Sequence, residues 1–162
     1  MHSDLIEELQ ALTERLWARA GLGDCVQIAR ERHDDGSPHI EVVAGRYDIV
    51  VRERGRELQR IAGLSLSDTA RWFLFGMAVA HAQSAELGSR SAPKNAPALA
   101  SGIQDDGYSR WNWMAPTVDT MSRISSDLGD WTLQEFRRVL SRTPLAEHEK
   151  RNARYPLLPA PE

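Results

Sequence analysis

The chain has 162 residues, of which 41% are hydrophobic and 27% are charged. This length favours one domain, and these fractions are typical of a folded protein and not of a disordered one. The net charge of −3 argues against a nucleic-acid-binding protein, because such proteins usually carry a basic surface. Cys25 is the only cysteine, which excludes a disulfide framework within the chain. With no signal-peptide pattern and no apolar run of about 20 residues, we expect a cytoplasmic protein.

The first predicted element is an amphipathic helix over residues 3–21. Four leucines recur there at the spacing of successive helical turns, so they share one face that is expected to pack against a core. Gly21 follows the last of them, at a position where glycine commonly ends a helix. These leucines are Leu5, Leu9, Leu12 and Leu16.

The next part of the chain changes to the alternating pattern that is typical of β-strands. Apolar and polar residues alternate in four short runs, and turn-forming pairs such as Asp-Gly and Ala-Gly separate these runs. Links this short favour antiparallel neighbours, so the pattern predicts a β-meander. The predicted strands cover residues 25–32, 40–43, 47–51 and, as a short fourth strand, 56–61.

The third of these strands opens the charged stretch "RYDIVVRERGRELQR" and has two different faces. Tyr47, Ile49 and Val51 are expected to face the core, because alternate strand residues share a side. Gly55 is expected to supply the positive φ of the following turn. The charges either meet a binding partner or protect a sheet edge from aggregation, and both interpretations stay open. The residues predicted to face outward are Asp48, Val50, Arg52 and Arg54.

Helices dominate the second half of the sequence. Ser65 and Asp68 have the spacing of a capping box and are predicted to begin a long, largely buried helix. A loop over residues 91–102 follows, and then a helix whose apolar residues keep near-heptad spacing. A shorter helix is predicted to begin with a second capping box at Thr132 and to stop before Pro144. The near-heptad residues are Trp111, Met114, Val118, Met121 and Leu128.

This order of elements predicts an α+β fold, because the strands come together first and the helices follow. We expect an N-terminal helix, an antiparallel β-meander of three to four strands, and a helical half packed on one face of the sheet. Residues 1–145 are expected to form a single α+β domain. Residues 146–162 are polar and then proline-rich, which predicts a frayed C-terminal tail.

The search for catalytic or metal-binding patterns finds only one candidate. His33, Asp34, Asp35 and His39 bracket one turn, where they could hold a cation, although a solvated hairpin tip is the more common meaning of such residues. No helical histidine pair, glycine-rich phosphate loop or nucleophile elbow is present. We therefore expect no catalytic residue, no metal and no cofactor. The alternative is a small hydrolase or metal-dependent enzyme with its site at the His33–His39 hairpin.

Two tryptophans in the second half raise the question of a contact surface. Trp111 and Trp113 are two residues apart, so a regular helix does not point both in one direction. An exposed Trp113 beside Arg110 would suit a protein-contact anchor, since tryptophan and arginine are enriched in binding hot spots. The equally weighted alternative is that Trp113 packs on the preceding loop.

Several of these residues together resemble the immunity protein 63 family of bacterial polymorphic toxin systems. The shared pattern is an aromatic-led strand that runs into a Val-Val-x-Glu-Arg-Gly-x-Glu motif, a helix that ends in Ala-Gln-x-x-Glu-Leu-x-x-Arg, and a later helix opened by an acid and a base. The resemblance covers roughly residues 34–145. The matching residues are Tyr47, Val50, Val51, Glu53, Arg54, Gly55, Glu57, Arg60, Asp68, Trp72, Ala82, Gln83, Glu86, Leu87, Arg90, Asp106 and Arg110.

The resemblance implies a protein without catalysis of its own. Such a protein binds the toxic C-terminal domain of a cognate bacterial toxin, one to one, and blocks its active site or substrate path; a nuclease is a reasonable expectation for that toxin. A nucleic-acid-binding adaptor is the least favoured alternative, because the chain is acidic. The residues predicted to contact the partner are Asp34, Asp35, Asp48, Arg52, Arg54, Arg110 and Trp113.

Overall fold

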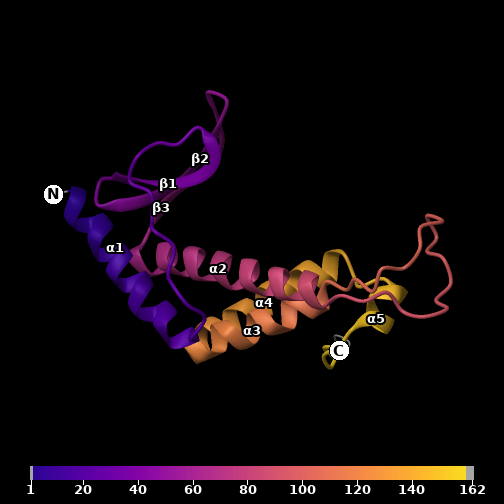
Figure 1. Ribbon diagram of the computed structural model, residues 1–162. Helices are drawn as coiled ribbons and strands as arrows, with labels where there is room; N and C mark the ends of the chain where they lie inside the picture. Colours follow the sequence, from indigo (N-terminus) through magenta and orange to yellow (C-terminus); the bar gives the residue numbers. More distant parts are fainter. Residues whose placement is uncertain (1, 160–162) are drawn as a thin grey trace. The chain divides into compact units, whose positions relative to one another are not determined.

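The computed structural model describes residues 2–159, with side chains from residue 4 onward (Figure 1). The order of elements is mixed α+β, as predicted, with one helix before the sheet and the other helices after it. Among the described residues, no helix is both long enough and apolar enough to cross a membrane. The elements are α1 (His2–Trp17), the short 3-10 helix η1 (Ala18–Ala20), β1 (Asp35–Val43), β2 (Arg46–Glu53), β3 (Arg56–Leu64), α2 (Leu66–Ser89), α3 (Trp111–Ile124), α4 (Ser126–Arg142) and α5 (Glu147–Asn152).

Contacts within the chain group it into two compact units, residues 1–74 and 75–162. The division falls inside α2, so the predicted boundary at residue 145 does not coincide with a break between units. The start of α2 is capped as expected: the Asp68 backbone N–H donates to Ser65 Oγ at 3.1 Å, which satisfies one of the free N–H groups of the first turn.

The sheet of the first unit is an antiparallel meander in the order β1-β2-β3. Two-residue turns join the strands, at Ala44-Gly45 and at Arg54-Gly55, and all four of these residues have positive φ between 50° and 76°. This is the conformation that matches the right-handed twist of a hairpin. The positive φ predicted for Gly55 is confirmed.

The core of the first unit lies on one face of this sheet. Tyr47 and Ile49 of β2 are 3% and 1% exposed, and they pack with Leu9 of α1 and Phe73 of α2. The Tyr47 hydroxyl donates to the Leu5 carbonyl oxygen at 2.9 Å, so the aromatic ring is buried while its polar end has a partner. The amphipathic helix is therefore present as predicted, and Tyr47 and Ile49 face the core, whereas Val51 is only partly buried and lies outside this cluster.

The predicted strand over residues 25–32 is wrong. This segment is irregular along its length, and the sheet has three strands, the lower of the predicted numbers. The Gln10 side chain of α1 explains the difference, because it donates to the Val26 carbonyl oxygen at 3.0 Å and accepts from the Ile28 N–H at 2.8 Å. A helix side chain thus takes the backbone groups that a neighbouring strand would otherwise use.

The helices of the second unit divide at a different place from the one predicted. Ser125 accepts a hydrogen bond from the Leu128 N–H at 3.1 Å and caps α4, so Leu128 belongs to α4 and not to the near-heptad helix. Thr132 does not begin a helix: it is buried inside α4, where its hydroxyl donates to the Leu128 carbonyl oxygen at 2.8 Å. Pro116 lies inside α3, which begins five residues earlier at Trp111.

The frayed tail predicted for residues 146–162 is also wrong for the part that the structure describes. Residues Glu147–Asn152 form α5, and Glu149 in this helix is 5% exposed. Beyond the helix, the Pro156 carbonyl oxygen accepts from the Trp111 indole N–H at 2.9 Å, and Leu158 packs against the apolar cluster of the second unit. Tertiary contacts therefore order a segment whose composition is typical of a loose end.

A close approach of α3 and α4 gives a test of this packing. A Cβ atom on Gly129 would lie 2.8 Å from Ser122 Cα, whereas one on Gly76 of α2 would meet nothing within 4 Å. Alanine is the better helix former by about 1 kcal/mol. We expect Gly76→Ala to raise the free energy of unfolding by about 0.5–1 kcal/mol, and Gly129→Ala to lower it by about 1–2 kcal/mol because the helices must separate.

Urea denaturation followed by circular dichroism measures both values. If Gly129→Ala is as stable as Gly76→Ala, the close contact between α3 and α4 does not exist in solution.

Candidate functional site

The outward face predicted for β2 is partly wrong, because two of its residues are buried. Asp48 is 6% exposed and Val50 is 0% exposed. Asp48 accepts from Arg60 Nη1 at 2.8 Å and from the Gly63 N–H at 2.9 Å, both on β3. In the strand register Val50 lies between His39 and Arg60. Because β3 supplies both of these donors, the Asp48 carboxylate is hydrogen-bonded within the chain.

Arg60 is the centre of a network of charges on this face of the sheet. Its guanidinium contacts both carboxylate oxygens of Glu57, at 2.9 and 3.0 Å, and its Nη1 also donates to Glu41 at 2.9 Å. Hydrogen bonds to Glu57, Glu41 and Asp48 raise the pKa of Arg60, and the bonds from Arg60 lower the pKa of Glu57 and of Glu41. Many of the charged side chains of β2 and β3 therefore form ion pairs with one another within the sheet.

The β2–β3 turn brings together four residues of the predicted partner surface. Asp34 Oδ2 accepts from the Gly55 N–H at 2.7 Å, which fixes the turn from outside the hairpin. Asp35 stands opposite Glu53 in the register. Arg52 donates to the Gly55 carbonyl oxygen at 3.4 Å and is only 18% exposed in its side chain. The last of the four residues, Arg54, has a side chain that is 90% exposed.

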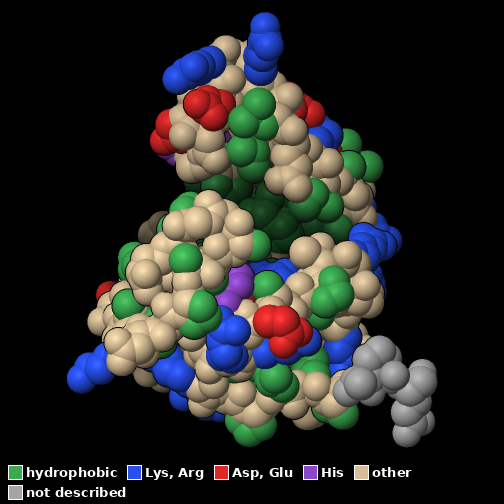
Figure 2. Space-filling view, turned by 90° about the vertical axis from the view of Figure 1, so that its right-hand side faces the viewer, with side chains coloured by type: hydrophobic (Ala, Val, Ile, Leu, Met, Phe, Trp, Pro, Cys, Tyr) green, Lys and Arg blue, Asp and Glu red, His purple; other side chains and the backbone are tan. Residues whose placement is uncertain are grey.

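The exposed groups at this turn form what we call the hairpin surface, and Figure 2 shows basic, acidic and hydrophobic side chains together on this uppermost part of the molecule. Leu58 of β3 is 59% exposed and adds an apolar side chain to the charged groups of the turn. A shallow hollow of about 480 Å³ lies among Glu53, Arg54, Arg56 and Leu58. The hairpin surface consists of Asp34, Asp35, Glu53, Arg54, Arg56 and Leu58.

The four residues considered as a cation site do not converge. His33 is exposed, whereas His39 is 2% exposed and its Nε2 lies 3.2 Å from Glu41 Oε1 on the sheet face. Asp34 is bound to the Gly55 N–H, and Asp35 accepts from the backbone and hydroxyl of Ser37, which lowers the pKa of Asp35. Among the described residues, no three potential metal ligands are gathered. The predicted turn therefore does not bring His33 and His39 together as ligands of one cation.

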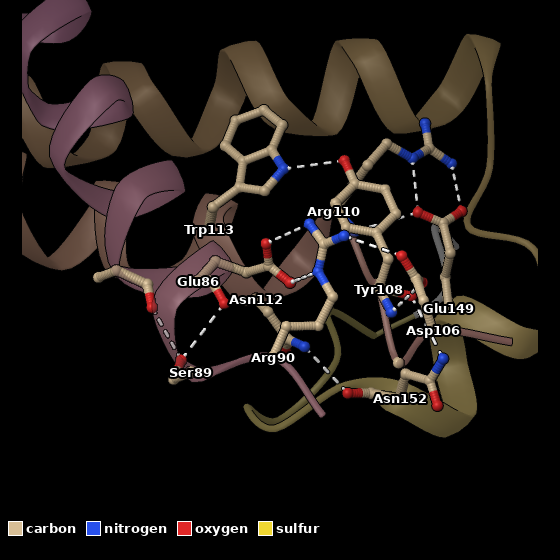
Figure 3. A network of polar contacts seen from close by, with 12 residues as sticks. Glu86, Ser89, Arg90, Asp106, Tyr108, Arg110, Asn112, Trp113, Glu149 and Asn152 are labelled. Carbon is tan, nitrogen blue, oxygen red and sulfur yellow. Dashed lines mark hydrogen bonds and ion pairs between the residues drawn. The ribbon is translucent and has the colours of Figure 1, made fainter. Parts of the chain in front are cut away.

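Arg110 of the second unit has its partners within the chain (Figure 3). Its guanidinium contacts both carboxylate oxygens of Glu149 at 2.8 Å and donates to the carbonyl oxygens of Thr143 and Pro144 at 2.9 and 2.8 Å. Its backbone N–H donates to Glu149 as well, at 3.0 Å. Arg110 thus connects the start of α3 with α5, which lies almost forty residues later.

Trp113 is packed within the second unit and is not an exposed anchor. Its indole N–H donates to the Tyr108 hydroxyl at 3.2 Å, and its ring meets Phe136 edge to face with centroids 5.8 Å apart. Of the two alternatives for this residue, packing on the preceding loop describes the structure. Trp111 lies in the same apolar cluster, so both tryptophans contact the core from different sides of their helix.

A second arginine contact holds the loop between α2 and α3 (Figure 3). Arg90 contacts both carboxylate oxygens of Glu86 at 3.0 and 2.8 Å and donates to Asp106 at 2.9 Å. The same guanidinium lies 4.8 Å from the centre of the Tyr108 ring. The two ends of the loop are thereby joined by one side chain.

Sequence reasoning missed the contributions of α5. Asn152 donates to Asp105 Oδ1 at 2.8 Å, and Glu149 holds Arg110 as described above. The one signal in the sequence is the spacing of Glu147 and Lys150, which bond at 2.7 Å on the exposed side of the helix. Nothing in that spacing indicates which carboxylate is buried.

Comparison of the chain with models of protein families, with curated proteins and with solved structures found no match. The resemblance to the immunity protein 63 family therefore stays a hypothesis that rests on the matching residues themselves.

The pH dependence of stability tests the contact between Glu149 and Arg110. Burial by itself raises the pKa of Glu149, but hydrogen bonds from the Arg110 side chain and from the backbone of Ala146 and Arg110 lower it to about 2, from an ordinary value of 4.5. The folded state therefore favours the ionised carboxylate. This stabilisation is complete above about pH 4.5 and is lost as the pH falls towards about 2.

We expect Glu149→Gln to lower the free energy of unfolding by about 3 kcal/mol at pH 7. The reason is that the Arg110 guanidinium would lose the negative charge that it contacts. The difference from the wild type should narrow steadily below pH 4.5. Urea denaturation at a series of pH values measures it. Glu147→Gln is the matched control, since the Glu147 side chain is 81% exposed and its substitution should leave the free energy of unfolding almost unchanged. A pH-independent difference for Glu149→Gln would contradict the assignment.

Proposed function

We propose that this protein is an immunity protein that binds and neutralises the toxic C-terminal domain of a cognate bacterial toxin in the cytoplasm, with no catalysis of its own. The observation that best supports this proposal is the hairpin surface. It combines charged groups of both signs with an exposed Leu58, and hydrogen bonds and backbone geometry fix the conformation of the turn. Arginine is one of the residues enriched in binding hot spots.

The division of charged residues into paired and exposed groups supports the same proposal. Arg60, Arg90 and Arg110 belong to the pattern that resembles the immunity family, and each of them is held by carboxylates of its own chain. Those residues maintain the fold. Arg54 also belongs to the pattern, but its side chain is 90% exposed and makes an ion pair with Glu53, at 3.7 Å. Recognition of a partner is therefore better assigned to the turn than to the networks behind it.

A rigid turn is suited to tight one-to-one binding. Little conformational freedom remains to be lost when the partner binds, because the Asp34 carboxylate and the Arg52 side chain already hold Gly55 from both sides. Charges of both signs at the tip favour fast association with one complementary surface and disfavour others. Neutralisation follows if the hairpin covers the toxin's active site or the path of its substrate.

The test is co-expression with the C-terminal domain encoded by the neighbouring gene, with a tag on one protein and with host survival as the second readout. Wild-type protein is expected to co-purify with the toxin domain and to restore growth. The combined variant Arg54→Glu and Arg56→Glu is expected to bind about 100-fold more weakly, because two exposed charges are reversed at the contact. Arg52 is a poorer choice, since its reversal would disturb the turn itself.

The matched control reverses Arg137 and Arg142, which are exposed on α4 and change the net charge by the same amount. This control should bind and protect like the wild type. Circular dichroism checks that all variants are folded. A folded Arg54→Glu, Arg56→Glu variant that still binds and protects would remove the hairpin surface from the interface, and the absence of both complex and toxicity with the wild type would remove the proposed function.

A further inference from the structure

The second unit contains an open groove that the networks described above do not fill. It has a volume of about 520 Å³ and is lined by the C-terminal half of α2, by α3 along most of its length and by the segment after α5. The groove, which we call the α2–α3 groove, brings together residues that are far apart in the sequence. Those used in the argument are Glu86, Ser89, Asn112, Asp119, Arg123 and Arg154.

Two arginines in this groove, Arg123 and Arg154, differ from the two arginines of the networks described above. Arg90 and Arg110 each contact both oxygens of a buried glutamate. Arg123 and Arg154 are exposed, and neither makes an ion pair with a carboxylate among the described residues. Their hydrogen bonds go to neutral acceptors instead. The positive charge of each guanidinium is therefore not neutralised by these contacts, and several of its N–H donors can bind a ligand.

Both guanidinium groups are nevertheless held in position. Arg123 Nη2 donates to the Thr120 hydroxyl at 3.2 Å, one turn earlier on α3. Arg154 Nη1 donates to the carbonyl and hydroxyl oxygens of Ser89 at 3.3 and 3.0 Å, at the end of α2. The Arg154 backbone N–H also donates to Asn112 Oδ1 at 2.7 Å, and Asn112 is 3% exposed. The groove thus contains two positively charged guanidinium groups whose positions are fixed by hydrogen bonds.

The remaining charges of the groove indicate which anion suits it. Both oxygens of Glu86 are occupied by Arg90, so the carboxylate that remains is that of Asp119 on α3. Two free arginines against one free aspartate favour an anionic ligand. A guanidinium fork matches a carboxylate with two parallel hydrogen bonds. The nearby Asp119 disfavours a doubly charged phosphate or a nucleic-acid backbone, whereas a peptide can place a polar or basic residue beside it.

We propose that the α2–α3 groove binds an acidic segment of the partner protein, with Asp or Glu carboxylates on Arg123 and Arg154. This inference rests on the proposed function for the identity of the partner, and it adds a second contact region that is separate in sequence from the hairpin. The first measurement needs no toxin. A short fluorescein-labelled peptide of alternating Glu and Ser residues is titrated with the purified full-length protein, and binding is followed by fluorescence anisotropy.

We expect the glutamate peptide to bind the wild type and to bind the double variant Arg123→Gln and Arg154→Gln at least tenfold more weakly, since each lost charged hydrogen bond is worth about a factor of ten. Asp119→Asn should tighten binding of the glutamate peptide by about twofold, because it removes an exposed negative charge that repels the negatively charged peptide. The matched control Arg137→Gln and Arg142→Gln removes the same charge from α4 and should leave binding unchanged. A peptide of alternating Lys and Ser residues should not bind.

Three results would overturn the inference: no binding of the glutamate peptide, equal loss of binding in the α4 control, or displacement of the peptide by inorganic phosphate at equal concentration. The last result would indicate a general anion site. Co-expression with the toxin domain then separates this inference from the proposed function. A folded Arg123→Gln, Arg154→Gln variant that binds and protects like the wild type would overturn the groove as a partner contact while the immunity function stands.

Discussion

The two-pronged contact between an arginine and a carboxylate is the interaction on which the rest of this structure depends. It occurs once at the sheet, once at the loop between α2 and α3, and once between α3 and α5. At the two sites in the second unit the acid of the pair is buried, whereas at the sheet Glu57 is exposed and the buried acid beside the guanidinium is Asp48. The pairs are Arg60 with Glu57, Arg90 with Glu86, and Arg110 with Glu149.

Burial explains why these contacts matter more than ordinary surface ion pairs. Glu86 and Glu149 are 4% and 5% exposed, and Asp48 beside Arg60 is 6% exposed. A carboxylate without a partner at such positions would lose its hydration without gaining a compensating interaction, which would destabilise the folded state. The arginines outside these contacts are not needed to pair with a buried acid. Arg54 projects into solvent at a fixed turn, and two others lie in the α2–α3 groove without an acidic partner among the described residues. Charges that the fold does not use are the ones available to a partner.

Local signals in the sequence predicted local structure well. The cap at Ser65, the positive φ at Gly55 and the burial of Tyr47 and Ile49 each depend on residues within a few positions of one another. The errors occurred where a distant residue decides the outcome. Gln10 takes the backbone groups of the predicted strand over residues 25–32, and β3 surrounds Asp48, which a strand pattern by itself places outside.

For the candidate sites too, local features could be predicted from the sequence, whereas features that depend on distant residues could not. The sequence by itself determined the α+β order of elements, the charged hairpin and the exposed turn, because alternation, turn residues and chain order are properties of neighbouring residues. Only the tertiary structure decided which charges are occupied. Arg110 and Glu149 are 39 positions apart, and no spacing rule connects them. The ordered C-terminal segment and the α2–α3 groove follow from that contact and its neighbours, because burial and pairing depend on which residues the fold brings together.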